Sequence, residues 1–110
     1  GLDWFSCFPH HPLIDACALE GMRPILCRQE RAGVNIADGF SRIKNGNTIG
    51  VFMMQSGPGA ENAFGGVAQA YADSVPILLY QEGPQDRERV PILPSKLLRI
   101  IKVLLNGSLI

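Results

Sequence analysis

The sequence predicts an α/β fold, a doubly wound parallel sheet with helices on both faces. Short apolar segments alternate three times with amphipathic segments of helical period, and the connections between them are short. Such alternation is typical of right-handed βαβ units, in which helices cover a parallel sheet. With 110 residues, 46% of them hydrophobic, the chain is expected to form one domain with a substantial core.

The first half of the chain contains two predicted strands and two predicted helices. Residues 4–8 form the first strand, and Pro12 suits the first position of a helix that Gly21 ends. Residues 24–27 form the second strand. From Glu30 the apolar period changes to 3.6, which predicts a second helix. The residues expected on its buried face are Gly33, Ile36, Ala37, Phe40 and Ile43.

The second half repeats the pattern. Residues 48–54 form a nearly unbroken apolar run, as expected for a strand covered on both faces. A Gly-Pro-Gly turn and a third helix follow, and residues 75–80 form the fourth strand. The apolar stripe of the third helix is expected to comprise Ala60, Ala63, Phe64, Val67, Ala68 and Tyr71. Residues 85–110 are expected to form a charged loop and a short helix over 96–105.

Charge and cysteine usage argue against several functional classes. Ten basic and ten acidic residues cancel, which argues against nucleic acid or an anionic membrane as a partner. Cys7, Cys17 and Cys27 lie ten residues apart, wider than the usual spacing of zinc ligands. We therefore expect reduced core thiols, no metal site in this chain, and a cytoplasmic protein. No leader peptide is visible, and the missing initiator methionine suggests a fragment or a processed chain.

Two motifs lie where a strand gives way to a helix, so both are expected at the carboxyl edge of the sheet, where ligands bind in open α/β folds. The first is Arg28-Gln29-Glu30. A carboxylate in an apolar cleft can share a proton with a ligand nitrogen, which would make Glu30 functional. Alternatively, Glu30 only complements the helix dipole.

The second motif is Ser56-Gly57-Pro58-Gly59-Ala60-Glu61-Asn62. Gly57 and Gly59 would let the backbone approach a ligand, and Asn62 offers a donor and an acceptor. A purely structural tight turn is the alternative. His10 and His11 follow the first strand, so one of them either faces a substrate as a proton donor or acceptor, or both lie in a surface loop.

Together these segments resemble the N-terminal pyrimidine-binding domain of thiamine-diphosphate enzymes, in the branch of acetolactate synthase, pyruvate oxidase and benzoylformate decarboxylase. The resemblance covers residues 4–81, and it assigns residues 1–84 to this domain, incomplete at its N-terminus. Gln81-Glu82-Gly83 departs from the Thr-Gly-Gln of relatives, and His10-His11 departs from their Pro-Gly. The matching segments are Phe8-Pro9, Arg28-Gln29-Glu30, Ala37-Asp38-Gly39-Phe40-Ser41-Arg42, Ser56 to Asn62, and Tyr71-Ala72-Asp73-Ser74-Val75-Pro76.

The resemblance implies an enzyme that decarboxylates or carboligates a 2-keto acid with thiamine diphosphate. Glu30 would hydrogen-bond the aminopyrimidine nitrogen and promote loss of the thiazolium C2 proton. His10 or His11 would lie toward the substrate. The residues expected to line the cofactor pocket are Pro9, Glu30, Ser56, Gly57, Gly59 and Asn62.

The resemblance also places part of the site outside this chain. Mg²⁺ would be held by a second domain, and relatives build each site between subunits, which implies a homodimer or homotetramer. FAD use is compatible with the resemblance but cannot be derived from these residues. This chain alone is expected to be inactive. Two alternatives remain: a non-catalytic doubly wound module that binds a nucleotide or a partner, and an inactive fragment.

Overall fold

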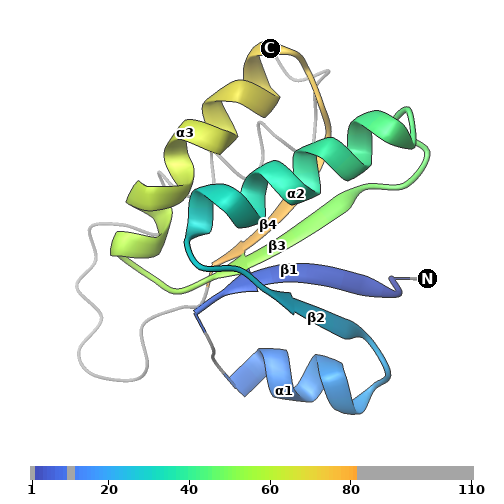
Figure 1. Cartoon of the computed structure of the whole chain (residues 1–110), viewed down its shortest axis with the longest axis vertical. Coiled ribbons are helices and arrows are strands. Elements are labelled where there is room, and N and C mark those ends of the chain that lie inside the picture. Colours follow the sequence, from blue (N-terminus) through green and yellow to red (C-terminus); the bar gives the residue numbers. More distant parts are fainter. Residues whose placement is uncertain (1, 10–11, 82–110) are drawn as a thin grey trace, which may run out of the picture.

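The computed structural model describes residues 2–9 and 12–81, which form a four-stranded parallel sheet flanked by three helices (Figure 1). The sheet has the order β2-β1-β3-β4, and every neighbouring pair is parallel. This confirms the predicted doubly wound α/β class. The strands are β1 (Trp4–Phe8), β2 (Arg23–Leu26), β3 (Gly50–Met54) and β4 (Ile77–Gln81); the helices are α1 (Pro12–Leu19), α2 (Glu30–Ile43) and α3 (Pro58–Ala72).

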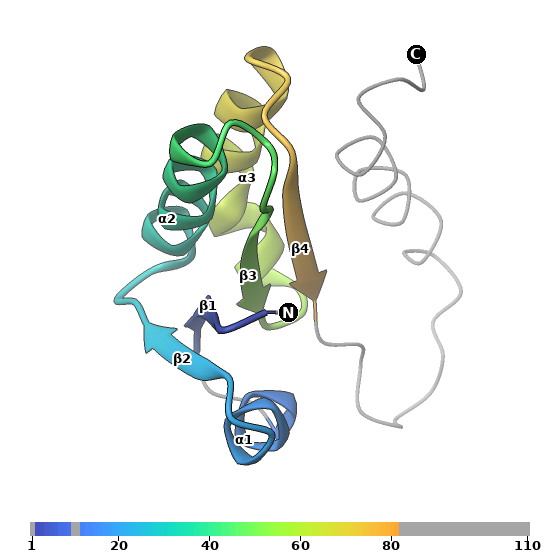
Figure 2. The ribbon, with the colours of Figure 1, turned by 90° about the vertical axis from the view of Figure 1, so that its right-hand side faces the viewer.

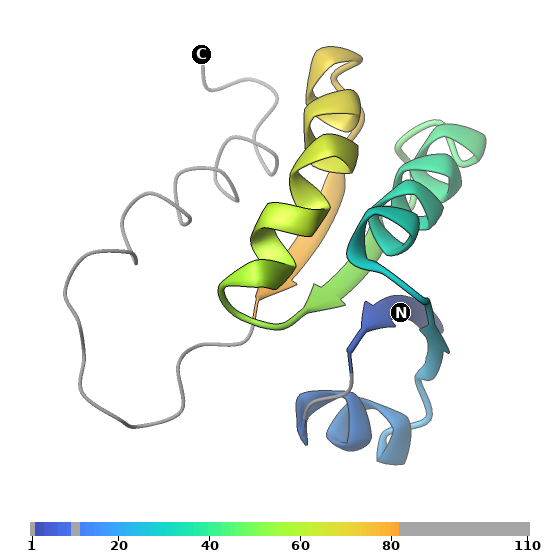
Figure 3. The ribbon, with the colours of Figure 1, turned by 60° about the vertical axis from the view of Figure 1, so that its left-hand side comes forward.

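Helices cover both faces of the sheet, as predicted. In two further views α2 and α3 lie next to each other over β3 and β4, whereas α1 lies apart from them beside β2 (Figure 2; Figure 3). The alternation of side chains along β3 places Phe52 and Met54 in the core beneath α2 and α3. Val51 and Met53 belong to the second core, against α1. All five residues of β3 are buried, as expected for a central strand.

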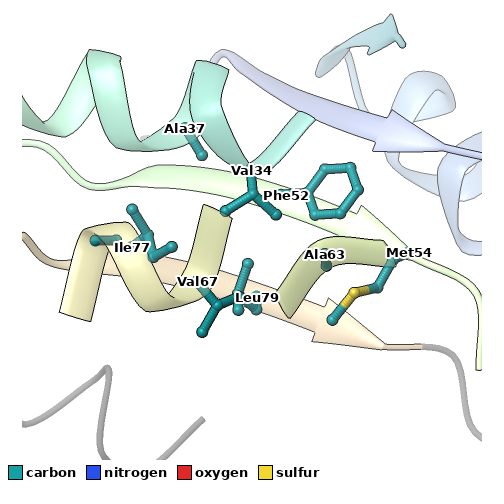
Figure 4. Close-up of a cluster of buried hydrophobic side chains, with 9 residues drawn as sticks. Val34, Ala37, Phe52, Met54, Ala63, Val67, Ile77 and Leu79 are labelled. Atoms are coloured by element: carbon teal, nitrogen blue, oxygen red, sulfur yellow. The ribbon is translucent and has the colours of Figure 1, made fainter. Parts of the chain in front are cut away.

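The larger core lies between the sheet and the pair α2 and α3 (Figure 4). Val34 of α2 and Val67 of α3 pack there against Phe52 of β3. Ile77 and Leu79 of β4 complete this layer. None of the described helices is both long and apolar enough to cross a membrane.

The buried face of α2 differs from the predicted one. Gly33 and Ala37 are buried as expected, but Ile36 and Ile43 are 39% and 84% exposed. The helix lies so close to β3 that small side chains fit beneath it and large ones do not: a Cβ on Gly33 would overlap the Phe52 ring. The buried residues of α2 are Glu30, Gly33, Val34, Ala37, Asp38 and Ser41.

The stripe predicted for α3 is also wrong in part. Ala63 and Val67 are buried, but Phe64 and Tyr71 are 59% and 47% exposed, and Ala68 is exposed. Besides Ala63 and Val67, the helix buries Gly59, Gly66 and Ala70. Gly66 faces α2, where a Cβ would overlap Val34, so small residues here allow the two helices to approach closely.

A polar network ties the C-terminal half of α2 to α3. Arg42 Nε donates to Asp38 at 3.0–3.1 Å, and its Nη2 donates to Asp73 at 2.7 Å. Gln69 Nε2 also donates to Asp38, at 3.3 Å. The hydrogen bonds to Asp38 and Asp73 raise the pKa of Arg42. Because Asp38 is only 3% exposed, its carboxylate needs these hydrogen-bond partners. Together these contacts link α2 to the C-terminal part of α3.

Candidate cofactor site

The strand order reverses between β1 and β3, which makes the carboxyl ends of these strands the switch point of the sheet. Ligands in open α/β sheets bind in the crevice at such a point. Pro9 follows β1 there, and Gln55 and Ser56 lead from β3 into α3. Glu30 begins α2 after the neighbouring strand β2. The fold therefore brings Pro9, Glu30 and Ser56 to one edge.

Glu30 and Gly59, which are 29 residues apart in the sequence, are brought together at this edge. A Cβ built on Gly59 would lie 3.6 Å from Glu30 Oε1 and 3.1 Å from Gln55 Cγ. Glu30 is 1% exposed, and none of the described residues forms a hydrogen bond or an ion pair with its carboxylate. A nearly buried carboxylate with no partner among the described residues, at the edge where ligands bind, is a candidate functional residue.

The two glycines of the turn have different roles. Gly57 has φ +69° and ψ −111°, a conformation that only glycine adopts without strain, and a Cβ there would meet nothing within 4 Å. Its backbone is exposed and open to a ligand. Gly59 has no unusual φ, but it is buried, and a Cβ there would crowd Gln55 and contact the Glu30 carboxylate.

Two contacts that the sequence did not reveal fix the start of α2. The Ser6 hydroxyl of β1 lies 2.8 Å from the Gly33 carbonyl and 3.1 Å from the Val51 carbonyl, and can donate to either. Gly33 lies directly over the Phe52 ring. Because Glu30 is one turn before Gly33, these contacts also position its carboxylate. The available signal for Ser6 was a single hydroxyl inside an otherwise apolar strand.

The other predicted residues differ in exposure. Pro9 and Ser56 are half-buried at the ends of β1 and β3, whereas Asn62 is exposed on the second turn of α3. His10 and His11 lie outside the described residues.

The residues at this edge fit one end of the implied cofactor better than the other. A nearly buried carboxylate next to a turn with exposed glycine backbone suits a nitrogen-containing ring, with which a carboxylate can share a proton. Within residues 2–9 and 12–81, no group of three or more His, Cys, Asp or Glu side chains is placed to hold a metal ion. These residues therefore offer a place for the aminopyrimidine rather than for a metal-bound diphosphate.

The three cysteines are free thiols. Cys7 and Cys17 are buried, as predicted for core thiols, whereas Cys27 is only half-buried. Burial, and next the neighbouring Cys27, raises the pKa of Cys7 to about 11. Burial also raises the pKa of Cys27. Both thiols are therefore protonated at neutral pH and are poor nucleophiles.

The chain is similar to known proteins over most of its length. Residues 6–90 match the family described as thiamine pyrophosphate enzyme, N-terminal TPP binding domain. The acetolactate synthase large subunit of Lactococcus lactis is 45% identical over 76 residues, which are 66% of this chain and 13% of that protein. The acetolactate synthase large subunit of Haemophilus influenzae is 36% identical over 83 residues, 72% of this chain and 14% of that protein.

A relative with a different name is similar over a shorter segment. The probable 2-ketoarginine decarboxylase of Pseudomonas aeruginosa is 41% identical over 59 residues, 54% of this chain and 10% of that protein. The chain thus spans only 10–14% of the length of these three relatives. Because the family match extends over more than half of the chain, the protein belongs to the thiamine pyrophosphate enzyme family, in the N-terminal TPP-binding domain.

Proposed function

We propose that this chain forms the aminopyrimidine-binding half of a thiamine diphosphate site, within a longer enzyme that decarboxylates or carboligates a 2-keto acid. The observation that carries the proposal is Glu30, a buried carboxylate without a partner among the described residues, beside Gly59 at the switch point. The names of the relatives, acetolactate synthases and a probable 2-ketoarginine decarboxylase, support this reaction class.

Each residue of the edge has a proposed task. Glu30 holds a proton shared with a ring nitrogen of the cofactor, and the apolar strand ends keep water from that proton. Gly57 presents open backbone, and Pro9, Ser56, Gly59 and Asn62 line the pocket. The bound cofactor supplies an electron sink for the carbanion that remains when carbon dioxide leaves. His10 and His11 are proposed to face the substrate.

The rest of the assembly is proposed from the family alone. Mg²⁺ and the diphosphate would be held by residues outside this chain, and two subunits would share each site in a homodimer or homotetramer. Residues 1–84 would form the cofactor domain. A cytoplasmic location is proposed from the reduced thiols.

Calorimetric titration of thiamine diphosphate into the full-length polypeptide, with and without Mg²⁺, tests the proposal. We expect saturable binding that requires Mg²⁺. The matched control is ADP with Mg²⁺, a nucleotide that also carries a nitrogen-containing ring and a diphosphate. Binding of the nucleotide without binding of thiamine diphosphate would instead support a nucleotide-binding module and contradict the proposal.

A further inference from the structure

The Gln81 side chain at the end of β4 has a buried polar atom that the fold leaves without a partner. Its amide oxygen is inaccessible to solvent, and no hydrogen bond to it is formed within the described residues. Among those residues it is the one side-chain nitrogen or oxygen that is itself wholly inaccessible and lacks a hydrogen bond; the Glu30 oxygens, in a residue that is 1% exposed, are not atoms of this kind. Buried polar atoms are nearly always paired, so an exception calls for a physical explanation.

The sheet places Gln81 at the same edge as the proposed site. Ile77 and Leu79 point into the core beneath α3, and Gln81, two residues further on, faces the same side. In the register of the sheet Gln81 pairs with Met54. Met54 Cβ lies 3.6 Å from a Cβ built on Gly59, which in turn lies 3.6 Å from Glu30 Oε1. A continuous row of neighbours therefore connects Gln81 to the buried carboxylate.

We propose that Gln81 is a further residue of the cofactor pocket and that its amide oxygen accepts a hydrogen bond from an N–H donor of the ligand. This inference rests on the proposed function, under which the donor is the amino group of the aminopyrimidine. Glu30 and Gln81 then bind the same ring: the carboxylate shares a proton with a ring nitrogen, and the amide oxygen recognises the amino group. The fold leaves the oxygen unpaired because the ligand pairs it.

Replacing Gln81 with leucine tests this idea, because apo stability and ligand affinity should respond in opposite ways. Gln81→Leu removes a buried unpaired oxygen, so chemical denaturation of the apo protein should show stability equal to or above wild type. The affinity of the full-length protein for thiamine diphosphate with Mg²⁺, measured by calorimetry, should fall about tenfold, the usual effect of one lost hydrogen bond. Tyr80→Phe, on the opposite face of β4, is the matched control and should leave affinity unchanged.

A ligand analogue gives a second readout that does not depend on turnover. Oxythiamine diphosphate has a carbonyl oxygen in place of the pyrimidine amino group, so it cannot donate to Gln81. Wild type should prefer thiamine diphosphate over this analogue, and Gln81→Leu should lose about tenfold of that preference, as in a double-mutant cycle. Gln81→Met serves as the variant if the leucine protein does not fold.

The outcomes separate the possible roles of Gln81. A destabilised apo protein with unchanged affinity would show that the amide serves the fold, and would overturn the inference. An equal loss of affinity for both ligands would show that Gln81 shapes the pocket without recognising the amino group, and would also overturn it. If wild type binds neither ligand, the proposed function itself fails, and this inference fails with it.

Discussion

Glu30 is nearly buried, with 1% of its surface exposed. It has no hydrogen-bond or ion-pair partner among the described residues. Asp38 on the same helix is comparably buried but accepts hydrogen bonds from Arg42 and Gln69. One helix thus contains two buried carboxylates, of which the fold stabilises only one. This contrast favours a structural role for Asp38 and a ligand-binding role for Glu30.

A substitution at Gly59, next to Glu30, should lower cofactor affinity more than it lowers the stability of the fold. Gly59→Val would place a branched side chain against Gln55 and the Glu30 carboxylate. The new side chain would also contact Met54, but its tightest neighbour is the half-buried Gln55 side chain, which can move, so we expect the melting temperature to fall by only about 5 °C. The affinity of the full-length protein for thiamine diphosphate should fall more than about tenfold, as measured by calorimetry.

Gly65→Val is the control for this prediction, since a side chain at Gly65 of α3 would meet only the end of the Arg31 side chain. It should leave affinity near wild type. A large loss of stability with unchanged affinity for Gly59→Val would favour a structural turn over a cofactor-lining one.

At the scale of elements, α2 carries the carboxylate and the sheet holds α2 in place. The contact of Gly33 with the Phe52 ring and the hydrogen bond from Ser6 both act one turn from Glu30. The hydrogen bonds from Arg42 to Asp38 and Asp73 hold the other half of the helix. The position of Glu30 therefore depends on packing distant from the ligand.

Adding one methyl group at Gly33 should displace α2 and so disturb the proposed site. Gly33→Ala would overlap the buried Phe52 ring, which forces the helix away from β3 at a cost of about 1–3 kcal/mol. Turnover of the full-length enzyme should then fall further than the loss of folded protein explains, as measured at a temperature where the variant is fully folded.

Gly39→Ala in the same helix gives the matched control, because a Cβ there meets nothing within 4 Å. It should raise the free energy of unfolding by up to about 1 kcal/mol and leave turnover unchanged. Equal activities of folded Gly33→Ala and Gly39→Ala would refute the link between this contact and Glu30.

The elements themselves could be predicted from the sequence, but their orientation could not. Within the described residues, periodicity located three helices and four strands with small shifts, such as β4 at Ile77–Gln81 instead of 75–80, whereas the tail predicted over 85–110, with its helix over 96–105, lies outside them. It assigned Ile36, Ile43 and Phe64 to the core because it counts apolar residues and does not account for the space beneath a helix. The contact of Glu30 with the Gly59 turn, and the roles of Ser6 and Gln81, depend on tertiary geometry that local patterns do not contain.

At the scale of the whole molecule, the chain is proposed to supply one side of a cofactor site. The described residues bring a carboxylate and a glycine turn to the switch point but contain no cluster able to hold a metal ion. Several large apolar side chains are exposed on them, including Leu26 at 67% and Phe64 at 59%. Such a surface is expected where other parts of an enzyme pack against a domain.

The 110-residue chain alone should therefore have no measurable activity and little affinity for thiamine diphosphate. Most of the binding free energy should come from the diphosphate and Mg²⁺, whose oxygen ligands we propose to lie outside this chain. Calorimetry on the purified chain, with circular dichroism to verify folding, provides the measurement. Saturable micromolar binding by the isolated chain would show that it holds more of the site than proposed here.

The central claim is that Glu30 activates the bound cofactor, and hydrogen–deuterium exchange at the thiazolium C2 position tests it without knowledge of the substrate. Glu30→Gln keeps the size of the side chain, and no described residue forms a hydrogen bond or ion pair with the carboxylate that would be lost, so the full-length protein should fold with undiminished stability. Exchange at C2 of the bound cofactor, followed by NMR after rapid quenching, should slow at least about 100-fold, and turnover should fall in parallel. Exchange at the wild-type rate in a folded, cofactor-loaded Glu30→Gln protein would contradict the account.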